Sequence, residues 1–123
     1  MHEVETFITS NSIMVTLKML LEQPGWYSEA PVYVPTKASD ILDRIDELDF
    51  PETFPDQQTA DIWSVKECTL ELKSAKEKEA IKFCLITFRK KGALSLSKEM
   101  RKMLKFFDAY EVEKEEEVKE KSE

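Results

Sequence analysis

Glycine and histidine are the residues that this sequence most lacks. Gly25 and Gly92 are the only glycines among 123 residues, so the glycine-rich loops that cradle phosphate groups cannot be formed. His2 is the only histidine. It stands at the N-terminus, where pairing with a serine or cysteine nucleophile is not expected. These absences argue against the commonest nucleotide-binding and nucleophilic activities, and we expect a protein that is not an enzyme.

Cysteine is scarce as well. Cys68 and Cys84 are too few for a disulfide framework, and we interpret them as two buried free thiols. Together with His2 they show none of the spacings typical of a metal site, so neither a metal nor a cofactor is expected. Carboxylates are abundant, and we interpret their densest set as the solvated face of a helix. Its members are Asp40, Asp43, Asp46, Glu47 and Asp49.

Long apolar runs are also missing. No stretch approaches the roughly 20 apolar residues that a membrane-spanning helix needs. Glu3 gives the N-terminus an acid where a signal peptide carries basic residues. We therefore expect a cytoplasmic protein with no membrane contact. The length predicts one globular domain over residues 1–110, followed by a charged and flexible tail over 111–123.

Charge is present in quantity and is unevenly distributed. Residues 1–63 carry 12 acids and three bases, residues 64–110 carry 12 bases and six acids, and residues 111–123 carry seven acids and three bases. The net charge of −7 therefore conceals a basic middle between two acidic ends. Such a charge pattern is typical of proteins that select their partners electrostatically.

The chain is organised around residues 68–89, which contain its longest nearly unbroken apolar run, Ile81–Phe88. Alternating apolar residues favour two strands joined by a charged turn, and we place this hairpin at the centre of a small antiparallel sheet. The residues Ser74 to Glu77 also spell a capping box, which favours a helix over 75–91. The β-branched and aromatic content favours the strand.

Four further elements are predicted around this segment. A short strand is expected over residues 4–9, and helices over 12–23, 40–49 and 98–110. The proline-bracketed segment 31–35 is expected to be an edge strand or an extended arm. The fold class is therefore α+β, with about three helices packed on the 68–89 hairpin. The alternative is a mostly α-helical bundle that ends in a pair of helices, 75–91 and 98–110.

The functional hypothesis is a small acidic adaptor, inhibitor or chaperone-like subunit that acts through protein–protein contacts. Its candidate contact residues are Trp26, Tyr27 and Tyr33, because exposed aromatic side chains are the usual anchors of interfaces. If 31–35 is an exposed edge, pairing with a second copy would make a homodimer.

Two alternatives remain open. The first is nucleic-acid binding through a basic segment over residues 89–105. Its phosphate contacts would be Arg89, Lys90, Lys91, Arg101, Lys102 and Lys105. The second is that the acidic helix and tail mimic nucleic-acid phosphates and block a basic partner.

Overall fold

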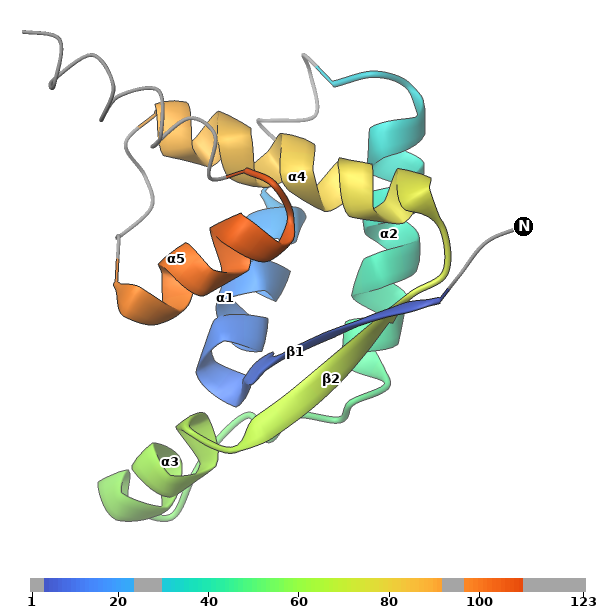
Figure 1. The fold of residues 1–123 in the computed structure, drawn as a ribbon. Coiled ribbons are helices and arrows are strands. Elements are labelled where there is room, and N and C mark those ends of the chain that lie inside the picture. The colour runs from blue at the N-terminus through green and yellow to red at the C-terminus, as the bar shows by residue number, and fades with distance from the viewer. Residues whose placement is uncertain (1–3, 24–29, 92–96, 110–123) are drawn as a thin grey trace, which may run out of the picture.

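The fold is α+β, with a two-stranded antiparallel sheet and five helices (Figure 1). The computed structural model describes residues 4–23, 30–91 and 97–109. In chain order the elements are β1 (Glu5–Ser10), α1 (Asn11–Glu22), α2 (Tyr33–Asp46), α3 (Gln57–Ser64), β2 (Glu67–Leu72), α4 (Ala75–Lys90) and α5 (Lys98–Phe106). Within these ranges, no helix combines the length and apolar character needed to cross a bilayer.

The sheet joins the first strand of the chain to one from its middle. β1 runs antiparallel to β2, with Glu5 opposite Leu72 and Ser10 opposite Glu67. Because strand side chains alternate, Phe7, Leu70 and Leu72 share one face and are buried, whereas their neighbours along each strand point to solvent. One face of the sheet therefore belongs to the core.

Helices cover this inner face. α1, α2 and α4 each contact β2, and α4 also packs along α2. The core is built from their buried aliphatic side chains together with those of α5, including Leu17, Ile41, Leu85 and Leu104. Burying a side chain of this size contributes about 1.5–3 kcal/mol. α3 contributes no buried residue and projects away from the body of the molecule (Figure 1).

The predicted 68–89 hairpin is wrong in its second half. β2 forms as expected, but residues 75–90 are helix α4, and β2 pairs with β1 instead. The Ser74 hydroxyl caps α4 by accepting from the backbone N–H of Glu77 at 3.3 Å, and Arg89 and Lys90 lie in its last turn. These end effects stabilise a helix. They prevail over the β propensity of the run.

Burial within α4 follows a helical period. Ala80, Ile81, Cys84 and Leu85 are buried, and Ile86 is half-buried beside that stripe. Three-to-four residue spacing brings the buried set onto one face. The helical interpretation of 75–91 is therefore confirmed, while the α+β class holds because β1 supplies the second strand.

The predicted edge strand over 31–35 is also wrong. Tyr33, Val34 and Pro35 form the first turn of α2, where a proline is tolerated because the N–H it lacks has no acceptor within the helix. The helix predicted over 40–49 thus begins seven positions earlier, at Tyr33, and ends at Asp46. Homodimerisation through an extended 31–35 segment loses its structural basis.

Three further elements, β1, α1 and α5, agree with the sequence. The strand at 4–9 is β1, and the helix at 12–23 is α1, whose cap is Ser10. α5 begins at Lys98 behind the cap Ser97 but ends at Phe106, earlier than predicted. Asp108 has a left-handed backbone with φ of 58°, which an aspartate tolerates and which ends the helical path. The predicted tail over 111–123 lies outside the described residues.

One buried ion pair ties three elements together. The Arg44 guanidinium of α2 makes a bidentate ion pair with the Glu77 carboxylate of α4, in which Nη1 donates to Oε1 at 2.7 Å and Nη2 donates to Oε2. Arg44 also donates to the backbone oxygen of Glu71 in β2 at 3.0 Å, and the N–H of Lys73 donates to Glu77 at 2.6 Å. Burial alone raises the pKa of Glu77, but these two donors hold it below its ordinary value.

Candidate functional site

The aromatic residues predicted to contact a partner are only partly within the described chain. Trp26 and Tyr27 lie outside the described residues. Tyr33 is the first residue of α2 and is half-buried, with the Lys76 ammonium 4.4 Å from the centre of its ring. Tyr33 thus packs against the start of α4, and part of its surface remains available.

The predicted basic surface is divided between two environments. Lys90 and Lys91 lie at the C-terminal end of α4, where they line a cavity of about 330 Å³ with Phe83, Ile86 and Thr87. Lys102 lies on α5 and lines a different cavity, which faces the sheet. Arg101 and Lys105 are also exposed on α5, whereas Arg89 is half-buried.

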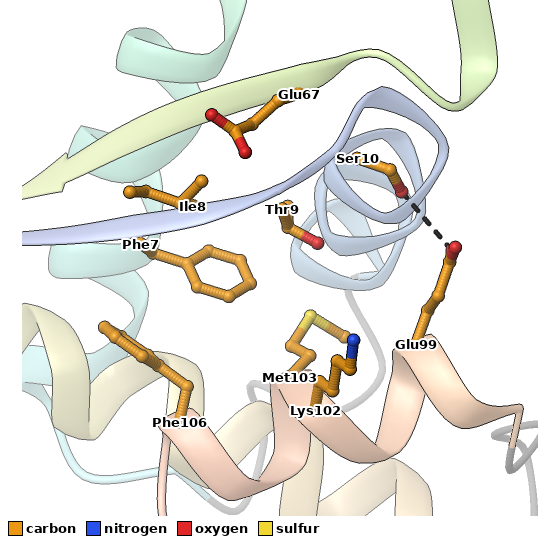
Figure 2. A pocket seen from close by; sticks show the side chains of 9 residues that line it. All are labelled: Phe7, Ile8, Thr9, Ser10, Glu67, Glu99, Lys102, Met103 and Phe106. Atoms are coloured by element: carbon orange, nitrogen blue, oxygen red, sulfur yellow. Dashed lines mark hydrogen bonds between the residues drawn. The ribbon is translucent and has the colours of Figure 1, made fainter.

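The cavity beside Lys102 lies between the sheet and a helix, and we take it as the candidate site. It is a half-open hollow of about 260 Å³ between β1 and α5, and we call it the β1–α5 groove (Figure 2). Four consecutive residues of β1 line it, together with one residue of β2 and four of α5. They are Phe7, Ile8, Thr9, Ser10, Glu67, Glu99, Lys102, Met103 and Phe106.

The floor of the groove is apolar and rigid. Figure 2 shows Phe7 and Thr9 on the α5 side of β1, facing Met103 and Phe106. The Phe7 ring lies 5.0 Å from the ring of Phe106 and 4.9 Å from that of Phe107, and these two are themselves 4.9 Å apart. Three aromatic rings in mutual contact fix one another's orientation. The floor is therefore preformed.

Polar contacts close the groove at its two ends. At one end the Ser10 hydroxyl lies 3.4 Å from the Glu99 carboxylate (Figure 2). Beyond the other end, the Lys78 ammonium of α4 binds Glu5 at 3.0 Å and lies 4.9 Å from the centre of the Phe106 ring. The open length between these contacts is the middle of β1.

The backbone N–H and C=O groups of Ile8 in β1 point toward this opening. The N–H of Asn11 donates to the oxygen of Lys66 at 2.8 Å. In an antiparallel ladder, hydrogen-bonded pairs alternate with pairs whose backbone groups point outward. Counting back along the register from Asn11, Phe7 and Thr9 bond to β2, while Thr6 and Ile8 present their N–H and C=O groups to the open edge.

The two edges of the sheet are not equivalent. At the outer edge of β2, the Arg44 guanidinium occupies the backbone oxygen of Glu71. At the edge of β1, no described residue hydrogen-bonds to the backbone of Ile8 outside the ladder. An unoccupied strand edge is a ready template for pairing with another chain.

The cysteines do not form a reactive centre. Cys84 is buried in α4, and its desolvation raises the pKa of the thiol to about 12. Burial followed by the charge of Glu67 raises the pKa of the half-exposed Cys68. Both groups are therefore protonated thiols near neutral pH, and a protonated thiol is a poor nucleophile. The described parts of the chain contain no cluster of His, Cys, Asp or Glu able to hold a metal ion.

Only part of this groove can be recognised from the sequence. Lys102 was among the predicted contact residues, although for nucleic acid. Phe7, Met103 and Phe106 follow the apolar periods of β1 and α5, so they could be assigned to a core. Their position beside an open strand edge depends on the pairing of β1 with β2, which no local pattern encodes.

No family model, curated protein sequence or solved structure shows a significant match to this chain. The functional proposal therefore rests on the geometry of the molecule itself.

Proposed function

We propose that this chain is a non-catalytic protein-binding subunit that holds an extended segment of another protein in the β1–α5 groove. The observation that carries the proposal is the outward-facing backbone of Ile8, which has an apolar floor beside it and no hydrogen-bond partner among the described residues. A strand added there would make the sheet three-stranded.

Strand addition accounts for both parts of the groove. Backbone hydrogen bonds to Ile8 would give affinity independent of sequence, and side-chain pockets would give specificity. Alternate side chains of the added strand would point inward, as those of Phe7 and Thr9 do, and would rest on Met103 and Phe106. We therefore expect the bound segment to alternate apolar and polar residues.

We further propose that the protein is cytoplasmic, and this and its non-catalytic character are supported by the chemistry of its residues. Glycine-rich phosphate loops are excluded by composition, and both thiols have raised pKa values. Cys68 and Cys84 are free, as is usual in the reducing cytoplasm. An adaptor, inhibitor or chaperone-like subunit would need only the groove.

A proline substitution tests strand addition directly. Ile8→Pro removes the N–H that faces the groove, while every ladder bond between β1 and β2 stays possible. Thr69→Pro is the matched control, because Thr69 lies opposite Ile8 and faces the other edge. Heptapeptides would first be selected on the wild-type protein from a random display library, and their affinities then measured by calorimetry.

We expect the selected peptides to alternate apolar residues and to bind wild type and Thr69→Pro alike. Ile8→Pro should weaken binding by about tenfold or more, since a strand added at an edge depends on backbone hydrogen bonds. Amide shifts on binding should map to β1 and α5. Peptides that bind Ile8→Pro as tightly as wild type would refute the proposal.

Nucleic-acid binding is the second candidate function, and it has less support. Lys102 faces the groove, and Lys90 and Lys91 border a cavity that is partly apolar. Retention of labelled nucleic acid on filters at low and high salt tests it, because phosphate contacts weaken steeply with salt. Absence of salt-dependent retention at low ionic strength would remove this candidate.

A further inference from the structure

Helix α3 forms although none of its residues belongs to the buried core. It is eight residues long and buries no side chain, whereas isolated helices of this length are marginal in water. Its ends are held locally. The Asp56 carboxylate caps it by accepting from the N–H of Thr59 at 2.7 Å, and the Ser64 hydroxyl donates to the oxygen of Asp61 at 2.8 Å.

A small aromatic cluster anchors α3 to the body. The Trp63 ring lies 5.2 Å from the ring of Phe50 and 5.2 Å from that of Phe54. At the base, the buried Asn11 side chain donates to the backbone oxygen of Trp63 at 2.9 Å, and the N–H of Asn11 donates to Lys66. The helix therefore projects from the body on a fixed base (Figure 1).

The surface so presented is apolar and acidic. Ile62 is 53% exposed and Val65 is 72% exposed, beside the half-buried Trp63. The charged residues of the segment from Phe50 to Glu67 are four acids and one base. They are Glu52, Asp56, Asp61, Lys66 and Glu67. Exposed aliphatic groups next to a tryptophan in a charged segment have the composition of an interface centre.

We propose that α3 is a second docking surface and that its occupant is a basic amphipathic helix of a partner protein. The segment that carries Ile62 and Val65 has four acids and one base, so it complements lysines and arginines, and the exposed pair takes apolar side chains. The backbone of α3 is engaged in its own hydrogen bonds, so recognition passes through side chains, as in the packing of an amphipathic helix. The surface shares Glu67 with the lining of the β1–α5 groove, but Asp61, Ile62 and Val65 lie outside that lining.

The test uses a 14-residue leucine–lysine peptide designed as an amphipathic helix, and the same peptide with every lysine replaced by glutamate. Binding to the full chain would be followed by amide chemical shifts and calorimetry. Ile62→Ser and Val65→Ser remove the apolar contacts, and Met19→Ser is their control because Met19 is equally exposed on α1. Asp61→Lys reverses one charge on α3, and Asp43→Lys makes the same change on α2.

We expect the lysine peptide to shift amides over residues 57–66 and the glutamate peptide not to bind. Each of the substitutions at Asp61, Ile62 and Val65 should weaken binding by about tenfold, since central interface residues carry most of the binding energy. The Met19 and Asp43 variants should bind as wild type does. Equal loss in Asp43→Lys and Asp61→Lys, shifts confined to other elements, or no binding at all would overturn the proposal.

Discussion

At the scale of single residues, Glu77 connects α4 to α2 and to the end of β2. Its carboxylate accepts from α2 through Arg44 and from the end of β2 through Lys73, while its own N–H is capped by Ser74. The side chain is only 4% exposed. A buried ion pair contributes little net stability against apolar replacements, but breaking one partner is costly. The pair therefore fixes where α2 lies relative to α4.

Glu77→Ala should lower the free energy of unfolding by about 3 kcal/mol, because the partly buried Arg44 charge is left without its partner. The double variant Arg44→Met/Glu77→Leu, which removes both charges, should lose much less. Urea denaturation followed by circular dichroism measures both. Equal losses in the single and double variants would show that the uncompensated charge is not the cause.

The same carboxylate predicts a dependence of stability on pH. The pKa of Glu77 is lowered in the folded protein, so its contribution is fully present above the unfolded-state value of about 4.3. It is lost as the pH falls from that value through the folded-state pKa. Denaturation at several pH values should show wild type losing stability faster than Glu77→Gln below about pH 4.3. Parallel curves for the two proteins would contradict this.

The thiols give a third expectation at this scale. In the folded protein Cys84 should not react with Ellman's reagent at neutral pH, because it is buried and its pKa is raised to about 12. Cys68 should react slowly, and both should react fully in denaturant. The Cys68→Ser variant isolates Cys84. Rapid labelling of that variant without denaturant would show that α4 opens readily.

At the scale of elements, the main question is why residues 75–90 form a helix and not a strand. Ile86 and Phe88 suit a strand, but the capped start, the basic last turn and the buried stripe all belong to a helix. The local sequence of this segment favours a strand by its residue types and a helix by its capping residues. The ends of the element and its tertiary partner α2 determined the outcome.

Ser74→Ala should lower the free energy of unfolding by about 1 kcal/mol, because α4 loses the acceptor for its first turn. Ser39→Ala is the control, since Ser39 is exposed in the interior of α2 and alanine suits a helix better than serine. Thermal or urea unfolding would distinguish the two. A Ser74 variant as stable as wild type would mean that the cap contributes nothing.

At the scale of the whole molecule, the sequence predicted elements better than it predicted their partners. Strand β1 and helices α1 and α5 follow from periodicity and capping residues such as Ser10 and Ser97, whereas α4 matches only the alternative prediction for its segment. The pairing of β1 with β2 joins Ser10 to Glu67, 57 positions apart, and no local pattern specifies such a contact. The β1–α5 groove depends on that pairing, so it could not be predicted.

The two faces of β1 should respond differently to truncation. Phe7→Ala should lower the free energy of unfolding by about 3 kcal/mol or more, because it removes the ring contacts with Phe106 and Phe107 and leaves a cavity. Ile8→Ala, on the outer face and 54% exposed in wild type, should change stability by no more than about 0.5 kcal/mol. Chemical denaturation compares them. Similar losses would mean that the outer face is covered.

The distance along the chain between the strands has a consequence for biosynthesis. β1 leaves the ribosome first, yet Leu72, the partner of Glu5, is translated 67 residues later. At typical elongation rates of about 5–20 residues per second, β1 therefore exists for several seconds before its partner strand β2 has been synthesised. During that interval Phe7 has no sheet to join, so nascent chains arrested before β2 should depend on chaperones to stay out of aggregates.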